Sequence, residues 1–189
     1  SNIILVGSDG IILDAVKRID FTQSSVRQIL PGFKYELPPK QDKSNITECD
    51  IKTVVDQIKM RSGKRLSSAV LDAVEGVSPL ISREIAAFAC GGDTAVDELT
   101  PIALQRLEAK LGEIKEMLLG EGAEPTMLLR DGVKPYDFTF MDITQYGFAV
   151  TPKRFGSFSE LLDDFYFEKD RFERTRQRSQ SLLKLLSNA

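Results

Sequence analysis

A short glycine-containing turn between two expected helices is the pattern in this sequence best suited to holding a phosphate group. Gly76-Val77-Ser78-Pro79 separates a helix expected at about 66–75 from one that begins at Pro79, an arrangement called helix-hairpin-helix. Backbone N–H groups at such a turn can bind a phosphate. Gly76, Ser78 and Arg83, which lies in the first turns of the second helix, are therefore candidate nucleic-acid-binding residues. An ordinary corner between two helices has the same sequence features and stays the alternative.

A second concentration of positive charge lies near the end of the chain. Arg171, Arg174, Arg176 and Arg178 fall within about two turns of an expected helix. They are candidate phosphate contacts. They could equally form a solvated face, because the first half of this helix is acidic, its second half is basic, and that polarity complements a helix dipole.

Several kinds of catalytic chemistry are excluded by residue type. The chain has no histidine, which removes Ser-His-Asp and Cys-His catalysis and histidine-ligated zinc. Gly91-Gly92-Asp93 matches no glycine-rich nucleotide loop and predicts a helix end. Asp163 and Asp164 are neighbours, which splay by about 100° on a helix. Carboxylate- or lysine-based chemistry stays open on composition alone, but no catalytic constellation is found, so we expect no enzyme activity, no metal and no cofactor.

Composition favours a soluble binding module. The 189 residues are 42% hydrophobic and 28% charged, with a net charge of -3, so any nucleic-acid contact must come from a local basic face. Cys49 and Cys90 form no CxxC pair and are expected to be free thiols in a reducing compartment. No apolar run suggests a membrane span and no signal peptide opens the chain. We expect a cytoplasmic location, and a chain cut from a longer protein.

The first expected element is a β-hairpin. Ile3–Val6 and Ile11–Val16 flank Asp9-Gly10, a dipeptide that favours a tight hairpin turn. An isolated hairpin is marginal in water. We therefore expect its strands to share a sheet or a core with strands near 126–150, or to pair outside this sequence.

Four helices are expected between about 45 and 120. Asn45 and Glu48 fit a capping box for the first, which runs to about Met60. Gly76 is expected to end the second. Ser78-Pro79 and Thr100-Pro101 each place an N-cap before an N1 proline, opening the third and fourth. The fourth has an apolar face formed by Leu104, Leu107, Leu111, Ile114 and Leu118.

Strands return at about 125. Thr126–Arg130 precedes Asp131-Gly132, a second hairpin turn, and Tyr146–Val150 reads as a third strand. Tyr136, Phe138 and Phe140 alternate, which predicts one aromatic strand face. Core packing is the favoured role of that face, and base stacking is the alternative.

The last segment is expected to be a long helix. Ser157 and Glu160 make a capping box. A heptad pattern, with a weak middle, predicts the entry to a coiled coil. Its two seam positions hold Phe158, Phe165, Phe172, Ser179 and Leu186, and Leu161, Glu168, Thr175 and Leu182.

Five motifs in order resemble the NFACT family, whose bacterial members were long called fibronectin-binding protein A. The motifs are Ser1–Val6, Ile12–Ala15, Val26–Gly32 with Tyr35–Pro39, Gly76–Leu80 with Arg83–Ile85, and Phe158–Asp163 with Glu168–Arg171 and Leu182–Lys184. The resemblance covers essentially the whole chain. It implies the end of an N-terminal domain, a helix-hairpin-helix domain and the start of a coiled coil. The family's tRNA-contacting Asp-Arg motif lies upstream of such a segment, and Asp170-Arg171 is not that motif.

The resemblance also implies a function. Family members bind large ribosomal subunits obstructed by an unfinished peptide on its tRNA, and bacterial members recruit alanyl-tRNA and support mRNA-independent alanine tailing. The large subunit and tRNA are therefore the expected partners, through the full-length protein. A fibronectin- or fibrinogen-binding surface adhesin is the alternative. A third class, a DNA glycosylase, needs a nucleophilic amine beside a carboxylate, which Ser1 does not supply.

The expected fold is α+β, with small antiparallel strand elements flanking a helical insert and a long coiled-coil helix at the end. Residues 1–41 would be the C-terminal part of the family's N-terminal domain. Residues 42–122 would be the helix-hairpin-helix domain, and 123–155 a β-meander packing with the first strands. Residues 156–189 would be the start of the coiled coil.

Overall fold

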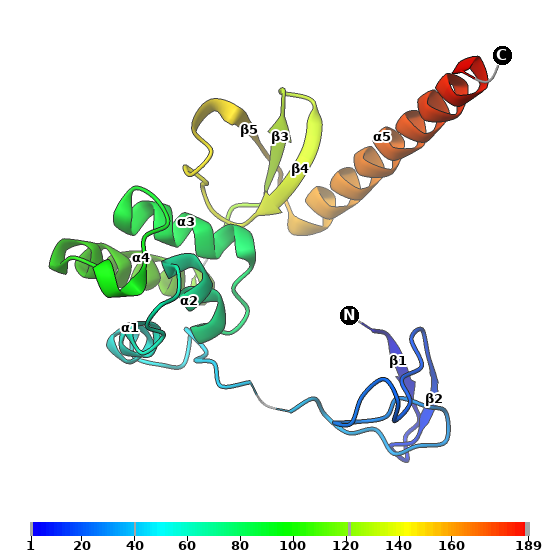
Figure 1. Ribbon diagram of the computed structural model, residues 1–189, viewed down its shortest axis with the longest axis horizontal. Helices are drawn as coiled ribbons and strands as arrows, with labels where there is room; N and C mark the ends of the chain where they lie inside the picture. Colours follow the sequence, from blue (N-terminus) through cyan, green and yellow to red (C-terminus); the bar gives the residue numbers. More distant parts are fainter. Residues whose placement is uncertain (1, 40, 121, 188–189) are drawn as a thin grey trace. The chain divides into compact units, whose positions relative to one another are not determined.

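The chain has an α+β fold, as the sequence predicts. The computed structural model describes residues 2–39, 41–120 and 122–187, without the side chains of 182, 183 and 185–187 (Figure 1). It divides into two compact units, Ser1–Asp42 and Lys43–Ala189.

The first unit is built on the predicted hairpin. β1 (Ile4–Val6) pairs antiparallel with β2 (Ile12–Ala15). Gly10, with φ of 81°, supplies the left-handed conformation that the turn requires. The chain that follows returns to the hairpin, because the Ile12 N–H donates to the Phe33 carbonyl at 2.8 Å and Gly32 donates to the Ile12 carbonyl at 2.8 Å. The hairpin is therefore stabilised by its own C-terminal loop.

The two sets of strands belong to two separate sheets. β1 and β2 form one, and β3, β4 and β5 form the other. The sequence predicts that these strands share a sheet or a core, and the first of these alternatives, the shared sheet, is wrong for the described part of the chain. The physical reason is that the loop through Phe33 occupies hydrogen-bonding groups of Ile12, and Tyr35 donates to the Gly10 carbonyl at 2.8 Å. A shared core stays a prediction.

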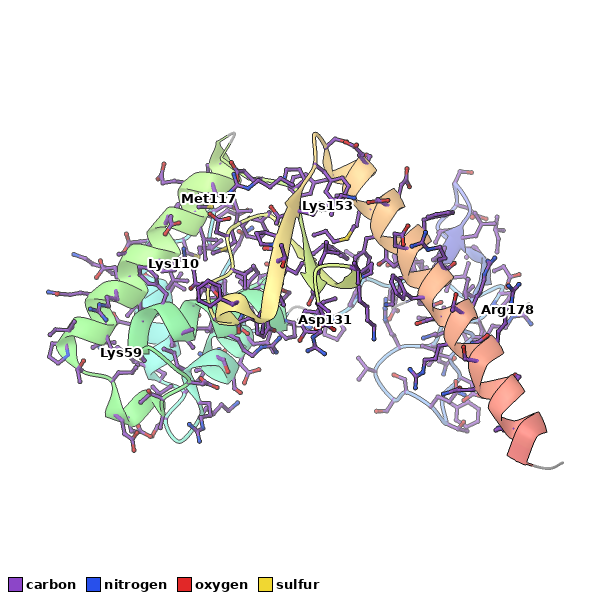
Figure 2. All side chains as sticks on the ribbon, turned by 90° about the horizontal axis from the view of Figure 1, so that it is seen from above. Lys59, Lys110, Met117, Asp131, Lys153 and Arg178 are labelled. Atoms are coloured by element: carbon purple, nitrogen blue, oxygen red, sulfur yellow. The ribbon has the colours of Figure 1, made fainter. Side chains whose placement is uncertain are left out.

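Four helices form the main core of the second unit. They are α1 (Ile51–Lys59), α2 (Leu66–Ala73), α3 (Pro79–Cys90) and α4 (Pro101–Leu119). Ile58, Leu66, Ile85 and Leu107 are completely buried where they meet, and each such side chain contributes about 1.5–3 kcal/mol. The predicted caps of α3 and α4 are confirmed. Figure 2 shows Lys110 and Met117 along α4.

The predicted start of α1 and end of α2 are both displaced, and one contact explains both. Ser44 pairs with Val74 in a parallel bridge, in which the Ser44 N–H donates to the Ala73 carbonyl at 2.7 Å. Val74 is therefore extended and ends α2 before Glu75. Asn45 caps only a separate turn, through Thr47, and Asp50 caps α1 instead.

A three-stranded antiparallel sheet follows the helices. β3 (Thr126–Arg130) lies between β4 (Lys134–Thr139) and β5 (Val150–Arg154). The predicted β3–β4 turn is confirmed, with Asp131 at its tip and Lys153 on β5 in Figure 2. The strand predicted at 146–150 is wrong. Gly147–Ala149 forms a short 3₁₀ turn, η2, and the strand begins only at Val150.

The single aromatic face predicted for β4 is also wrong. Leu128 pairs with Asp137 and Leu129 pairs with Pro135, so Tyr136 is the extra residue of a β-bulge. The bulge turns Tyr136 toward Leu128 and Val150, whereas Phe138 packs on the opposite face with Met127 and Phe165. Both rings therefore pack, in different clusters, and Phe140, which follows β4, packs against the helical core.

The chain ends in the predicted long helix, α5 (Phe158–Ser187). The Ser157 half of its capping box is confirmed, since the Glu160 N–H donates to Ser157 Oγ at 3.2 Å. The Glu160 carboxylate instead accepts from the Gly156 N–H, one residue before the N-cap, at 3.2 Å. Leu161 and Phe165 are buried against the sheet. Leu182 and Leu186, two predicted seam residues, lie outside the described side chains, and the coiled coil itself stays a prediction.

Candidate nucleic-acid interface

A buried carboxylate fixes the loop that leads from β4 to β5. Glu84 on α3 is only 1% exposed. It accepts hydrogen bonds from the Thr144 N–H at 2.9 Å, the Thr144 hydroxyl at 2.6 Å and the Gln145 N–H at 2.9 Å. The Gln145 side chain donates to the Leu80 carbonyl at 3.0 Å. The loop is therefore held against α3 where it delivers Tyr146.

Two arginines and two tyrosines meet beside this loop. Arg83 Nη2 donates to the Tyr146 hydroxyl at 3.2 Å, and the Tyr146 and Tyr136 hydroxyl oxygens lie 3.4 Å apart. The two rings pack edge to face, with centroids 5.5 Å apart. The guanidinium carbon of Arg130 lies 3.8 Å from the centroid of the Tyr136 ring. We call these four residues the arginine–tyrosine cluster.

The pKa values of the two tyrosine hydroxyls in the cluster shift in opposite directions. Burial raises the pKa of the Tyr146 hydroxyl above its usual value. The hydrogen bond shared with Tyr146, together with the positive charge of Arg130, lowers the pKa of Tyr136. Within the described part of the chain, no carboxylate lies within ion-pair distance of Arg83 or Arg130. Their charge is available to an anion.

The Gly76 turn faces an apolar groove of 640 Å³. Ser78 uses its hydroxyl to cap α3, accepting from Ile81 at 3.3 Å, and Gly76 has φ of 75°. The charged residues of the groove are Glu75, Arg83 and Asp137, and most of the others are apolar. Its lining gives a phosphate little electrostatic support. Gly76 and Ser78 as phosphate contacts stay predictions, and Arg83 borders both the groove and the cluster.

The four predicted arginines of α5 are all exposed, but they do not share one face. Arg171, Arg174 and Arg178 are spaced by three and four residues and lie along a shallow groove with Phe167, where Figure 2 labels Arg178. Arg176 is turned about 140° away from Arg171 on the helix. Arg171 pairs with Glu168 at 2.8 Å. We call Arg171, Arg174 and Arg178 the arginine face.

Sequence reasoning missed Arg130, Tyr146 and Phe148 as candidates. Phe148 lies on the η2 turn and is 107% exposed. A strand predicted over 146–150 gives alternate residues a buried side, which hides such a side chain. The signal that could have revealed it is Gly147, whose φ of 51° breaks the strand directly before Phe148.

The described part of the chain contains neither a membrane-spanning helix nor a metal-binding group of side chains. No helix there combines the length and the apolar character needed to cross a membrane. No group of three or more cysteine and carboxylate side chains there is arranged to hold a metal ion. The prediction that the protein uses no metal stays a prediction.

The sequence has identifiable relatives. It is 33% identical over 189 residues to a Bacillus subtilis (strain 168) protein named Rqc2 homolog RqcH, covering 100% of this chain and 30% of that protein. A Streptococcus suis (strain 05ZYH33) protein of the same name is 28% identical over 195 residues, which are 100% of this chain and 29% of that protein. The chain therefore spans less than a third of the length of these curated relatives.

Solved structures share the fold. A crystal structure of the fibrinogen binding protein from Staphylococcus aureus superposes with a TM-score of 0.64 at 25% identity, over 87% of this chain and 55% of that one. The N-terminal part of a fibronectin/fibrinogen-binding protein from Streptococcus suis gives 0.54 at 22% identity, over 89% and 53%, and supports the fold alone. A family model described as NFACT N-terminal and middle domains matches residues 1–189. The chain therefore belongs to the NFACT family and lies within its N-terminal and middle domains.

Proposed function

We propose that this chain is part of a ribosome-associated quality-control factor that binds tRNA and the obstructed large ribosomal subunit and supports mRNA-independent alanine tailing. The observation that carries the proposal is the family match over all 189 residues, joined to a relative named Rqc2 homolog at 33% identity. Because the chain spans 30% of that relative, it supplies only one part of the activity.

The part proposed for this chain is binding, without catalysis and without a cofactor, in the cytoplasm. Two features support RNA as what it contacts. The arginine–tyrosine cluster and the arginine face both present guanidinium groups on exposed surface. Arginine side chains bind phosphate oxygens in a bidentate geometry, which suits an RNA backbone. The absence of histidine from the sequence fits a factor that works with the ribosome and has no active site of its own.

Co-sedimentation tests this proposal. A full-length protein that carries this chain is centrifuged with purified large subunits, with small subunits as the control, over a series of salt concentrations. We expect selective co-sedimentation with large subunits that weakens as salt rises, because RNA contacts release counterions. Equal recovery with both subunits, or recovery with neither, contradicts the proposal.

The second candidate function is a fibronectin- or fibrinogen-binding surface adhesin. The observation that favours it is the structural likeness to the Staphylococcus aureus fibrinogen binding protein. Binding of the same full-length protein to immobilised fibrinogen and fibronectin separates the two candidates. Saturable binding to these proteins without selective co-sedimentation favours the adhesin.

A further inference from the structure

A fully exposed aromatic ring lies on a turn whose two ends contact the two arginines of the cluster. Phe148 is 107% exposed on a turn that begins at Tyr146 and ends at Val150. Tyr146 accepts a hydrogen bond from Arg83, and Val150 is the cross-strand partner of Arg130. The turn is therefore attached to one arginine on each side of Phe148.

The turn that presents this ring is built firmly. Gly147 donates to the Thr144 carbonyl at 2.9 Å and Ala149 donates to the Tyr146 carbonyl at 3.0 Å. Val150 is buried at the end of the turn, and Glu84 accepts hydrogen bonds from Thr144, two residues before its start. An exposed phenylalanine contributes nothing to the core. Because the backbone of the turn is fixed, stacking of a flat partner on the ring needs to order only the Phe148 side chain.

A further basic residue lies opposite Arg130 in the sheet. Arg130 is paired directly with Lys134 across the β3–β4 hairpin, although like charges opposite each other destabilise a strand pair. Asp131 follows Arg130 in the turn, and Asp137 borders the groove beside Arg83. Neither carboxylate forms an ion pair with these arginines among the described residues.

We propose that the 146–150 turn binds an unpaired nucleotide, with the base stacked on Phe148 and the adjacent phosphate held by Arg83 and Arg130. The chemistry recognised is that of single-stranded nucleic acid, and RNA is its source if the proposed function holds, on which this inference rests. Guanidinium groups beside an exposed ring are the combination by which proteins hold unpaired nucleotides. A protein partner would instead require further apolar surface around the ring.

A tryptophan reporter tests the stacking directly. The chain contains no tryptophan, so Phe148→Trp places the single indole of the 189-residue protein at the proposed contact. The variant is titrated with oligouridylate of about 12 nucleotides, with the matching oligothymidylate, and with duplex RNA. We expect both single strands to quench the tryptophan fluorescence and the duplex to leave it unchanged. No quenching by oligouridylate up to about 1 mM overturns the proposal.

Substitutions separate the ring from the charges. Phe148→Ala should weaken oligouridylate binding by roughly 5- to 100-fold without changing its salt dependence, since stacking releases no counterion. Arg83→Gln and Arg130→Gln should each weaken binding and reduce the slope of log affinity against log salt by about 0.7. Matched controls are Phe21→Ala, at a ring that is 73% exposed, and Arg106→Gln, at an exposed residue of α4. The controls should bind as the unmodified chain does.

The outcomes distinguish this site from the proposed function. If Phe148→Ala and both arginine variants bind oligouridylate as the unmodified chain does, the site is overturned, whatever the full-length protein does with ribosomal subunits. If the fluorescence of the Phe148→Trp variant is quenched while co-sedimentation fails, the nucleotide site stands and the ribosomal function falls. A change in tryptophan fluorescence caused by fibrinogen, and by neither single strand, overturns the proposal in favour of a protein contact.

Discussion

The Glu84 carboxylate accepts hydrogen bonds from both the backbone N–H and the hydroxyl of Thr144, at 2.9 and 2.6 Å, across 60 residues of sequence. Glu84 is buried in α3, whereas Thr144 lies two residues before the turn that carries Phe148. One side chain therefore couples the helical core to the candidate interface. Its effect on stability and on binding can be measured in the same variants.

We expect Glu84→Ala to reduce the free energy of unfolding by about 3 kcal/mol. The substitution removes the hydrogen bonds to a buried charged group and leaves the donors on Thr144 and Gln145 without an acceptor. Glu84→Gln should cost roughly half as much, since one oxygen acceptor survives. Urea denaturation followed by helical circular dichroism measures both. Glu116→Gln, at an exposed carboxyl on α4, should leave the midpoint unchanged. Glu84→Ala with an unchanged midpoint would show that the loop is held by other contacts.

Helix caps and tight turns could be predicted from the sequence, because each depends only on residues that are neighbours in the chain. Ser78 and Thr100 cap α3 and α4 as predicted, since a hydroxyl before an N1 proline satisfies the first amides of a helix without distant help. Asp131 and Gly132 form the predicted turn for the same reason. The arginine face of α5 follows from helical spacing once Arg176 is excluded.

Elements that depend on distant partners could not be predicted in this way. The sequence predicts that α1 starts at Asn45, because nothing local reveals that Ser44 pairs with Val74. The bulge at Tyr136 breaks an alternation that the sequence alone shows as regular. Arg83 and Tyr146 meet across 63 residues, so no spacing rule brings them together. The candidate site is therefore mostly a product of tertiary packing.

Adding a methyl group at Gly132, in the β3–β4 turn between Arg130 and Lys134, should lower the stability of the protein. Gly132 has φ of 70°, so Gly132→Ala should destabilise by about 1 kcal/mol through left-handed backbone strain. Gly112→Ala, in the interior of α4 with open space at its Cβ position, should instead stabilise by about 0.5–1 kcal/mol. Thermal unfolding of both variants measures the two effects. Shifts of the same sign would contradict the assignment of the strain to the turn.

The turn between α1 and α2 should give stability a distinct acid dependence. Asp97 accepts from Ser62 Oγ and from the Gly63 N–H, both at 2.7 Å, and these bonds, that from Ser62 foremost, lower the pKa of Asp97 below its ordinary value of 3.8. The folded state therefore gains stability that is fully present above pH 3.8 and is lost as pH falls through the lowered pKa.

Asp97→Asn tests that dependence. The variant should be less stable than the unmodified chain at neutral pH, and the difference should shrink as pH falls below 3.8 and through the lowered pKa of Asp97. Urea midpoints at a series of pH values measure it. Glu98→Gln, at the exposed neighbouring residue, is the control and should show no such narrowing. A difference that stays constant down to the lowest pH would mean that the Asp97 charge does not stabilise the turn.

The contribution of an α5 arginine to RNA binding should depend on whether it lies on the arginine face. Arg174 and Arg176 are both exposed, and no ion pair of either is found among the described residues. Arg174 lies on the arginine face, and Arg176 does not. Replacing either one by glutamate changes the net charge equally. If the face binds phosphate, Arg174→Glu should weaken co-sedimentation with large ribosomal subunits more than Arg176→Glu does.

The salt dependence supplies the second readout. Replacing Arg171, Arg174 and Arg178 together by glutamate should flatten the slope of log affinity against log salt by about 2, because each lost phosphate contact removes roughly 0.7–0.9. The fold should survive, since α5 packs through Leu161 and Phe165, and circular dichroism checks this. Equal binding and equal slopes for all variants would show that these arginines form a solvated face complementing the helix dipole. RNA contact would then have to lie elsewhere.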